Sequence, residues 1–554
     1  MNSKAVLIRV LVILGIVNLL FLAGCGGGAS QSLNNQPPPP PPSSQPTAVT
    51  VSPSSATVQP SGVQQFTATV SPSGADQGVT WSVSGPGCAG ASCGAIAAGQ
   101  YFAPATPPNP PMVTVTATSV ADSNKFGLAT VTVAPLPATL LIDATPPVGV
   151  TVLSFSVTVT RAALQPGDIA LVTNPVSVEI NRLQVETSLL ANLPIPSNTY
   201  TGLTVTFANP VLTILNNSGA ANGSCANGAI CKLTPALAVS SVNLTGQPFP
   251  VTYDGRAPFV LLLDFDLSRS LSSFATVNPV VMVRQVTSAG PEGVRVKQVL
   301  GKIVNGVGDV WDGTIFDMVT DVGTITGVDD NFNHAQYVDG DGYCGSGAFC
   351  LNGQTVEADL RVPRVPFWLA DRITVKSSDQ TELEGVIVNI NSDTQFDIVL
   401  LHQVPNVAGL ELGDLVRINL QSGATIEAVD TNPKSTGLLF SAPSDLLVGQ
   451  VVTARALSAP SGTPLAVITD RVRLKGGALT GRVKSIVNAT DFVMDSLSAN
   501  FPSAQIQVRT SAQTSFEGIS GVAALKVGDT VSLSGFLLKT SGDPMLLPEG
   551  VRKR

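Results

Sequence analysis

Leu153-Ser-Phe-Ser-Val-Thr-Val-Thr160 alternates apolar and hydroxyl-bearing side chains without a break. Successive side chains of a β-strand point to opposite faces of the sheet, so this period of two predicts a strand with one buried face and one face in water. The same period recurs from Val176 to Ile180, and residues 200–207 form a further predicted strand. Residues 259–263 are apolar at every position, which predicts a strand that is buried on both faces.

The composition extends this prediction to the whole chain. The chain has 554 residues, which indicates several domains, and charged residues make up 12%, about half of the usual share. Val, Thr and Ser are abundant, Gly and Pro are frequent, and helix-forming Lys and Glu are scarce, which is typical of an all-β secreted protein. The net charge is only −8 and no basic stripe occurs, so we expect no nucleic-acid partner. The terminal Arg552-Lys553-Arg554 is interpreted as a solvated tail.

Residues 136–290 are predicted to form one β domain. Leu140-Leu-Ile-Asp-Ala-Thr-Pro-Pro147, Val157-Thr-Val-Thr-Arg161 and Asn198-Thr-Tyr-Thr-Gly-Leu203 together resemble an uncharacterised domain family of bacterial exported lipoproteins. Asn198 stands where that family has glycine. The resemblance implies a β fold and an exported location, but no activity.

Two carboxylates of this domain flank Phe265 and therefore share one face of their strand. Asp264 and Asp266 are interpreted as the end of a strand that emerges into water. The alternative is a metal-binding or acid–base carboxylate pair.

Residues 47–135 have the size and the short, turn-bounded strands of a β-sandwich. Val51-Ser-Pro-Ser-Ser-Ala-Thr-Val58, Gln64-Gln-Phe-Thr-Ala-Thr-Val70, Val79-Thr-Trp-Ser-Val83 and Val113-Thr-Val-Thr-Ala-Thr-Ser119 resemble the bacterial Ig-like domains of group 2. The resemblance implies that Trp81 belongs to the core of the sandwich and is not a platform for sugar stacking. Such domains mostly act as stalks and spacers of surface proteins, and some act as adhesive units.

The C-terminal half contains a diverged repeat, which we divide into residues 299–380, 381–475 and 476–554. The last two copies have a Gly-started strand, a strand with one Phe (Phe396 or Phe492) and a Gly-Asp turn into a Val-rich strand, as in Leu412-Gly-Asp-Leu-Val416. Residues 324–329, followed by Phe332, are interpreted as the start of the first copy. The pattern resembles small OB-like β-barrel repeats of unknown function in bacterial envelope proteins. OB-like barrels can bind sugars or nucleic acids. Here the aromatic residues occupy core positions, so a structural role is favoured.

The seven cysteines divide into three close pairs and one odd residue. Cys88 with Cys93, Cys225 with Cys231, and Cys344 with Cys350 each enclose a loop of small and polar residues. In an oxidising compartment such pairs form disulfides, and neither the spacing nor the neighbouring residues favour a metal site. Cys25 remains alone.

The N-terminus has the parts of a secretory signal: Lys4 and Arg9, an apolar run of residues 10–22, and small residues before Cys25. Leu22-Ala-Gly-Cys25 resembles the lipobox of bacterial lipoproteins. The resemblance implies that residues 1–24 are removed and that acylated Cys25 holds the chain on membrane lipid. The location is then the cell envelope, and in a diderm bacterium the outer membrane, because Gly26 is not the Asp that retains lipoproteins at the inner membrane. Residues 25–46, rich in Gly and Pro, form the tether.

No catalytic residue is predicted. His334 and His402 are the only histidines, His402 is interpreted as a strand-end surface residue, and the fingerprints of hydrolases, zinc proteases, phosphate loops and dinucleotide sites are absent. The one candidate cofactor is Ca²⁺, because oxygen-bearing side chains occur at alternate positions of a Gly-rich stretch. Its candidate ligands are Asp329, Asn331, Asn333, Asp339 and Asp341. The alternative is a solvated loop pinned by the Cys344–Cys350 disulfide.

These observations predict a lipid-anchored, multidomain, all-β cell-envelope protein, with an Ig-like β-sandwich, a second sandwich-like domain and small β-barrel repeats. We expect a structural or binding role with an envelope protein or a polysaccharide as partner. The alternative is an enzyme that acts on envelope polysaccharide through a pair of carboxylates, because that chemistry needs no histidine.

Overall fold

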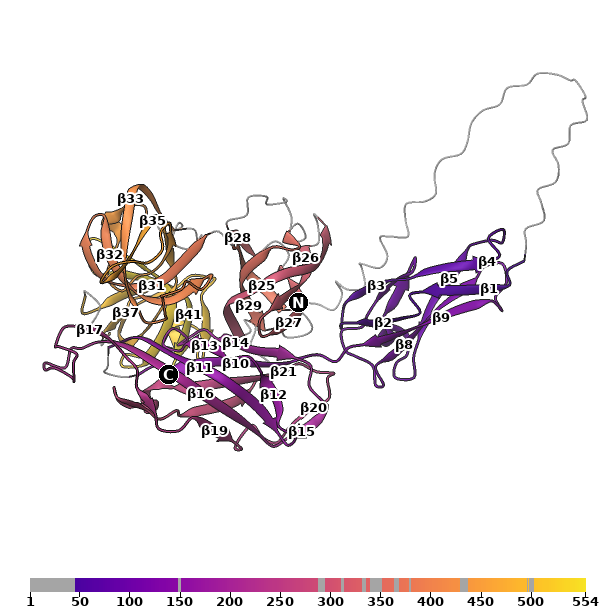
Figure 1. Cartoon of the computed structure of the whole chain (residues 1–554), viewed down its shortest axis with the longest axis horizontal. Helices are drawn as coiled ribbons and strands as arrows, with labels where there is room; N and C mark the ends of the chain where they lie inside the picture. The colour runs from indigo at the N-terminus through magenta and orange to yellow at the C-terminus, as the bar shows by residue number, and fades with distance from the viewer. Residues whose placement is uncertain are drawn as a thin grey trace, which may run out of the picture.

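The computed structural model describes residues 45–147, 151–286, 294–309, 313–330, 335–338, 351–362, 368–377, 380–428, 437–495, 497 and 503–554. The fold is all-β, as predicted, with several sheets and four very short helices in these residues. Figure 1 shows two parts: an Ig-like module stands apart at the right, and the remaining strands form a larger body, which we call the head.

The Ig-like module is a β-sandwich, which confirms the prediction. One layer is the sheet β2-β9-β8-β5, and the facing strands form the pair β1-β4 and the three-stranded sheet β3-β7-β6. Phe66, Tyr101, Val115 and Val131 are fully buried between the layers. Trp81 packs against this core but is only half-buried. The elements are β1 (Ala48–Ser52), β2 (Ser55–Val58), β3 (Val63–Gln65), β4 (Thr67–Ser71), β5 (Val79–Ser84), η1 (Gly90–Cys93), β6 (Ala95–Ala97), β7 (Gln100–Phe102), β8 (Met112–Ser119) and β9 (Phe126–Val133).

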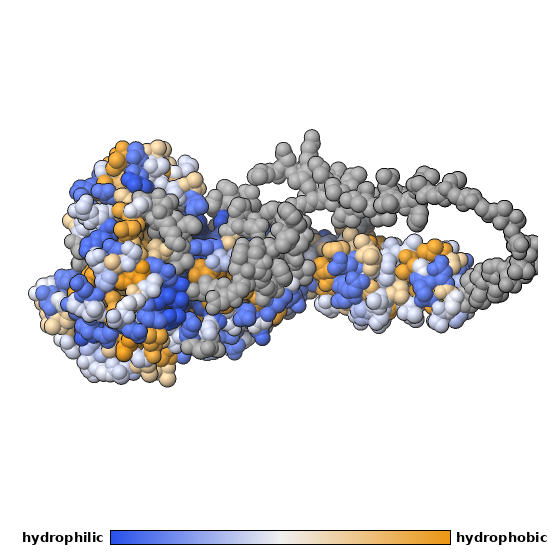
Figure 2. Space-filling view, turned by 90° about the horizontal axis from the view of Figure 1, so that it is seen from above, coloured by the Kyte–Doolittle hydropathy of each residue, from blue (hydrophilic) through white to orange (hydrophobic). Residues whose placement is uncertain are grey.

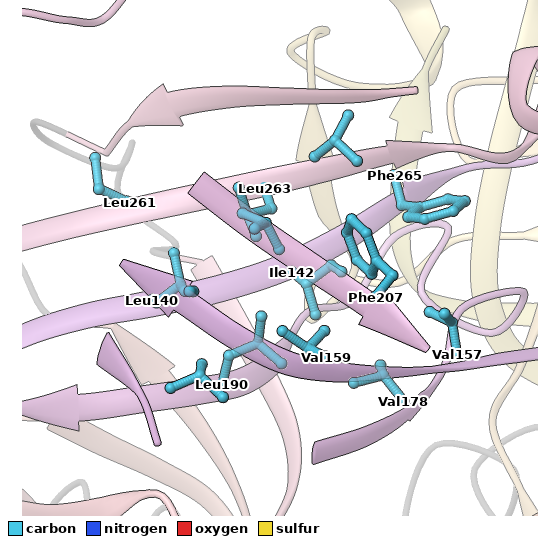
Figure 3. Close-up of a cluster of buried hydrophobic side chains, with 14 of the residues drawn as sticks. Leu140, Ile142, Val157, Val159, Val178, Leu190, Phe207, Leu261, Leu263 and Phe265 are labelled. Carbon is cyan, nitrogen blue, oxygen red and sulfur yellow. The ribbon is translucent and has the colours of Figure 1, made fainter. Parts of the chain in front are cut away.

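The second β domain is built around two long antiparallel strands, β11 and β16. Its core lies between these strands and the parallel pair β10 and β21. Figure 3 shows Phe207 and Phe265 next to each other in this core. Their ring centroids are 5.5 Å apart. The elements are β10 (Ala138–Thr145), β11 (Val152–Gln165), β12 (Ile169–Val172), β13 (Val176–Glu179), β14 (Ser188–Leu193), β15 (Asn198–Tyr200), β16 (Gly202–Leu215), β17 (Ile230–Leu233), β18 (Ala236–Leu237), β19 (Ser241–Leu244), β20 (Val251–Tyr253), β21 (Phe259–Asp266), α2 (Leu267–Ser270), β22 (Leu271–Ser273), β23 (Thr276–Val277) and β24 (Val281–Gln285).

Residues 259–263 are buried on both faces, as predicted, and the two faces belong to different cores. Phe259, Leu261 and Leu263 point into the core of the second β domain. Val260 and Leu262 pack with side chains of the neighbouring barrel. One continuously apolar strand therefore joins two modules.

The prediction for residues 153–160 is wrong in one respect. Ser154, Ser156 and Thr158, expected in water, are almost fully buried. A register shift between Val152 and Ser154 turns Leu153 away from the domain core, and Leu153 belongs to a buried cluster with Val399 of the second C-terminal repeat (residues 381–475). The outer face of β11 is covered because other modules pack on it, which the alternation alone does not reveal.

The C-terminal half forms three small barrels of five strands each with one common order. If the five strands of a barrel are numbered along the chain, their order around the barrel is 1-2-3-5-4, and strand 4 pairs with strand 1 to close it. Among these pairings, only that of strands 3 and 5 is parallel. The first barrel contains β25 (Val294–Asp309), β26 (Gly313–Thr320), β27 (Gly323–Asp329), β29 (Thr355–Val362) and β30 (Trp368–Val375), with β28 (Gln336–Val338) beside β30. The second contains β31 (Thr381–Ser392), β32 (Gln395–Val404), β33 (Leu415–Glu427), β34 (Val451–Ala456) and β35 (Leu465–Lys475), with η3 (Pro443–Asp445). The third contains β36 (Gly477–Ile486), β37 (Asp491–Asp495), β38 (Ile506–Arg509), β40 (Thr530–Leu538) and β41 (Met545–Lys553), with β39 (Ser515–Glu517) and η4 (Val522–Ala524).

The barrels are packed onto one another and onto the second β domain. Phe536 and Leu547 of the third barrel belong to the same buried cluster as Phe396 of the second. Asn192 of β14 bonds to the backbone of β27, and a Cβ at Gly323 would lie 2.0 Å from the Asn192 carbonyl oxygen. Only glycine permits this approach, because the φ of residue 323 is +124° as well.

The interpretation of residues 552–554 as a solvated tail is wrong. Arg552 is 7% exposed and lies in β41, and its guanidinium contacts Asp143 of β10. The side chain of Arg554 donates to the carbonyl oxygen of Ala144 at 2.8 Å. The end of the chain is therefore part of the joint between the third barrel and the second β domain.

Candidate functional site

A cavity of about 130 Å³ lies where the second β domain meets the three barrels. Its lining combines an apolar wall, which includes Leu153, Val386 and Leu401, with many polar side chains. Nine of the lining side chains are ionisable: Glu179, Arg182, Glu186, Lys297, Asp359, Arg372, Glu384, Lys475 and Glu549. Concave sites between domains are the usual places for ligands, so this cavity is the candidate functional site of the head.

Lys297 of β25 is the centre of the charged lining. Its Nζ lies 3.2 Å from Asp359 Oδ2, 3.3 Å from Glu549 Oε2 and 3.6 Å from Glu186 Oε1. Burial by itself would lower the pKa of Lys297, but the three carboxylates outweigh burial and raise it. Lys297 therefore remains charged and neutralises carboxylates from the second β domain, the first barrel and the third barrel.

The second barrel joins the same lining through Glu384. The Nε2 of Gln298 donates to Glu384 Oε2 at 2.7 Å, and Lys475 Nζ lies 3.9 Å from the same oxygen. Gln298 sits at a β-bulge of β25 with a φ of +55°, and its backbone N–H donates to Asp359. The bulge directs the adjacent side chains of Lys297 and Gln298 toward different carboxylates.

Asp359 shows the electrostatic consequence of this arrangement. Burial raises its pKa, but the charges of Lys297 and Arg372 have the larger combined effect and lower it to about 2. The carboxylate of Asp359 is therefore ionised at neutral pH, and its oxygens accept hydrogen bonds from Lys297, Arg372 and the Gln298 backbone.

Glu179 behaves in the opposite way, although it lines the same cavity. It is 2% exposed, and its two oxygens accept from the backbone N–H groups of Phe155 and Arg182, each at 2.8 Å. Burial raises its pKa to about 7 despite these hydrogen bonds and the charge of Arg182. The side chain holds the turn after β13 against β11.

Glu179 predicts a pH dependence of stability. Because its folded pKa lies near 7, above the ordinary 4.5, its contribution is fully present at pH 4 and is lost as the pH rises toward 7. The free energy of unfolding of wild type should fall by up to about 3 kcal/mol from this group over that interval. Glu179→Gln cannot titrate, so urea midpoints at pH 4.5 and 7.5 should differ less in the variant. Parallel pH profiles for the two proteins would contradict this assignment.

A second charged cluster joins the first and second barrels. Lys376 Nζ lies 2.6 Å from Glu382 Oε2 and 3.6 Å from Glu357 Oε2, and His402 Nε2 lies 3.1 Å from the same Glu357 oxygen. Burial opposes ionisation of Glu357, but Lys376 and His402 hold its pKa well below the usual range. His402 is thus half-buried at a junction between barrels, and its interpretation as a surface residue is wrong.

The structure contains two of the three expected disulfides, Cys88–Cys93 and Cys225–Cys231. Cys344 and Cys350 lie outside the described residues, as do Cys25, His334 and four of the five proposed calcium ligands, namely Asn331, Asn333, Asp339 and Asp341. Asp329 ends β27. Within the described ranges no group of three or more His, Cys, Asp or Glu side chains is arranged to hold a metal ion. The calcium site therefore stays a prediction.

Asp264 and Asp266 do not form a pair. Asp264 accepts a hydrogen bond from Thr145 Oγ1, whereas Asp266 is buried and caps α2 by accepting from the backbone N–H of Arg269 at 3.0 Å. The expected emergence into water is wrong for Asp266, because α2 continues the chain directly. The neighbour of Asp264 across the sheet is Asp143.

Fold and site together define a multidomain all-β protein that consists of an Ig-like sandwich and a head of one β domain and three barrels. Residues 46–126 match the family described as bacterial Ig-like domain (group 2), which confirms the resemblance of the first module. Residues 480–543, in the third barrel, match a family described as a domain of unknown function, DUF5666. A comparison with curated proteins gives no significant match.

Two solved structures align over most of the chain but at very low similarity. The crystal structure of the insect immune protein hemolin is 10% identical, with 91% of this chain and 100% of that chain covered and a TM-score of 0.13. Protocadherin gamma B2 extracellular cadherin domains 3–6 are 10% identical, with 90% and 99% covered and a TM-score of 0.12. At these scores neither structure supports an argument. In the described part of the chain, no helix has the length and apolarity needed to span a membrane.

Proposed function

We propose that this chain is a lipid-anchored cell-envelope protein with a structural or binding role, held on membrane lipid through acylated Cys25. The Ig-like module is its spacer, and the head is the part that is presented away from the membrane. Its partner is an envelope protein or a polysaccharide, and its location is the outer membrane if the source is a diderm bacterium.

The observation that carries the structural part of this proposal is the joining of the head around Lys297, whereas the anchor rests on the sequence Leu22-Ala-Gly-Cys25. Three modules contribute carboxylates to one buried lysine, and the fourth joins through Gln298 and Glu384. Such an arrangement holds several modules in one orientation, which suits a rigid presenting body. The Ig-like module makes few polar contacts with it, among them Arg256 Nε to the Pro107 carbonyl oxygen at 3.1 Å. The many polar contacts within the head and the few between the head and the Ig-like module support the interpretation of the Ig-like module as a spacer that carries a preformed head.

The common strand order of the barrels supports their assignment as OB-like. In that fold a parallel pairing of the third and fifth strands closes a five-stranded barrel, and one face and its loops hold the ligand. Phe396 and Phe492 are fully buried, so these aromatic rings serve the barrel cores and not a ligand.

The alternative role, a polysaccharide-active enzyme, would have to use the cavity carboxylates. Asp359, Glu384 and Glu549 each already have a cationic or amide partner there, which favours the non-enzymatic role.

The anchor is tested by metabolic labelling with an acyl chain. We expect wild type to incorporate the label and to fractionate with membranes, whereas Cys25→Ser incorporates none. The reason is that the thiol is the acceptor of the lipid, and two or more acyl chains are needed for stable attachment. Cys225→Ser is the matched control, because it removes a cysteine that lies in a disulfide of the head. Continued labelling of Cys25→Ser would refute the anchor.

A further inference from the structure

The Ig-like module is almost free of charge. Residues 47–135 contain three charged side chains, Asp76, Asp122 and Lys125. In Figure 2 the deepest blue, which marks the most hydrophilic residues, gathers on the head. A surface with so few charges offers almost no ion pairs to a charged partner, so it suits a neutral partner better.

The outward face of the sheet β2-β9-β8-β5 carries rows of hydroxyl groups. Ser84, Thr114 and Thr130 stand side by side on three neighbouring strands, and Ser82 and Thr116 form the next row. Thr118 continues the face. We call these six residues the hydroxyl face. Neighbouring strands lie about 4.8 Å apart and alternate residues of one strand about 6.8 Å apart, so the hydroxyls form a regular two-dimensional array.

The hydroxyl groups of this face are available to a ligand. Ser82, Ser84 and Thr130 are exposed, and Thr114, Thr116 and Thr118 are half-buried. Among the described residues none of the six side chains has a hydrogen-bonding partner in the protein. Each hydroxyl can both donate and accept, which matches the hydroxyl groups of a sugar.

Apolar side chains border the array. Leu128 lies directly beside Thr116 and is 53% exposed, and Phe126 lies beside Thr118 and is 54% exposed. Met112, 48% exposed, stands at the opposite end of β8. The face therefore offers uncharged hydrogen-bonding groups next to an aromatic ring and an aliphatic side chain, and the C–H faces of a sugar ring can pack on such side chains.

We propose that the hydroxyl face, with Phe126 and Leu128, is a docking surface for a neutral polysaccharide. An anionic glycan would find no cation on the face. A second copy of the module fits less well, because the centre of a protein interface is normally apolar and poor in serine, whereas the centre here is made of hydroxyls. The inference rests on the binding role proposed above and names the class of its partner, and it gives the Ig-like module a part in binding besides that of a spacer. It does not depend on the lipid anchor.

The test is affinity electrophoresis of the detergent-purified full-length protein in native gels that contain hydroxyethylcellulose, dextran or alginate. We expect retardation by at least one of the two neutral polymers and none by alginate. Thr116→Glu should weaken the retardation about tenfold or more, because a carboxylate would lose its water against a neutral polymer. Thr116→Val, which keeps the shape and the strand preference, should weaken it about two- to tenfold through the loss of one hydroxyl.

Thr69→Glu is the matched control, because Thr69 is exposed on β4, which is not part of this sheet. It should leave the retardation unchanged. The proposal is overturned if neither neutral polymer retards the protein, if alginate alone does, or if Thr69→Glu weakens binding as much as Thr116→Glu. Acyl labelling of Cys25 is measured separately, so a failure of the docking surface and a failure of the anchor are distinguishable.

Discussion

Arg552→Met should lower the free energy of unfolding by about 3–5 kcal/mol, because it removes one partner of a buried ion pair. Arg552 donates from Nη1 to Asp143 Oδ2 at 3.0 Å and from Nε to Glu517 Oε2 at 2.7 Å. Burial raises the pKa of Asp143 to about 6 even in the presence of Arg552. Without the guanidinium, the carboxyl of Asp143 would be still harder to ionise, and the third barrel would lose its hold on β10.

The measurement is the urea midpoint at pH 7.5, followed by tryptophan fluorescence. Lys553→Met is the matched control, because its side chain is 31% exposed and its ion pair with Asp529 is screened by solvent and contributes little to stability. The double variant Asp143→Asn/Arg552→Met should recover part of the loss, because no charge is then left in the joint. Equal midpoints for Arg552→Met and Lys553→Met would contradict the role of this pair.

The sequence predicts the local structure of this protein well where the pattern is periodic. The alternation in Val113–Ser119 and the uniformly apolar run of residues 259–263 both mark strands, because a period of two or a continuous apolar run leaves few other solutions. The Gly-Asp turns of residues 413–414 and 528–529 both lead into strands, but at different places, because β33 is the third strand of its barrel and β40 is the fourth strand of its own. These signals are local, since neighbouring residues carry them.

Which faces become buried is not a local property. Ser154 and Thr158 have the sequence signature of a solvated face, yet the second barrel covers part of their strand. Asp266 and Arg552 are charged, so the sequence predicts that they lie at the surface, yet both are buried by parts of the chain that their neighbours in sequence do not reveal. A hydroxyl side chain is compatible with water and with a hydrogen-bonded interior, so the pattern predicts the strand but not its environment.

The charged lining of the cavity could not be predicted at all. Glu186, Lys297, Asp359 and Glu549 are separated by tens to hundreds of positions, and each one resembles an ordinary exposed residue. The cluster depends on the β-bulge at Gln298, where a non-glycine residue adopts a positive φ. No sequence signal marks this bulge, because it depends on the pairing of β25 with β29.

Lys297→Met should be at least as damaging as the loss of Arg552. It leaves Glu186, Asp359 and Glu549 close together without their common cation, and breaking such a buried cluster costs about 3–5 kcal/mol. Arg372 still contacts Asp359 at 3.3 Å, so Glu186 and Glu549 bear most of the repulsion. The urea midpoint at pH 7.5 should fall accordingly, and the three barrels should become more susceptible to proteolysis at their junctions.

The pH dependence separates lost charge compensation from lost packing in this variant. Without Lys297 the carboxyl of Glu549 loses the main charge that lowers its pKa and lies buried beside two other carboxylates, so protonation relieves the repulsion. The variant therefore regains stability as the pH falls toward 5, and its deficit relative to wild type shrinks. A deficit that is independent of pH would mean that the aliphatic stem of Lys297, and not its charge, holds the modules together. Lys302→Met is the matched control, because Lys302 lies on the same strand with its side chain exposed and should leave the midpoint within about 0.5 kcal/mol of wild type. At pH 7.5 we therefore expect equal urea midpoints for wild type and Lys302→Met and a much lower midpoint for Lys297→Met. The difference between Lys297→Met and wild type narrows at pH 5 only if the buried carboxylates cause it.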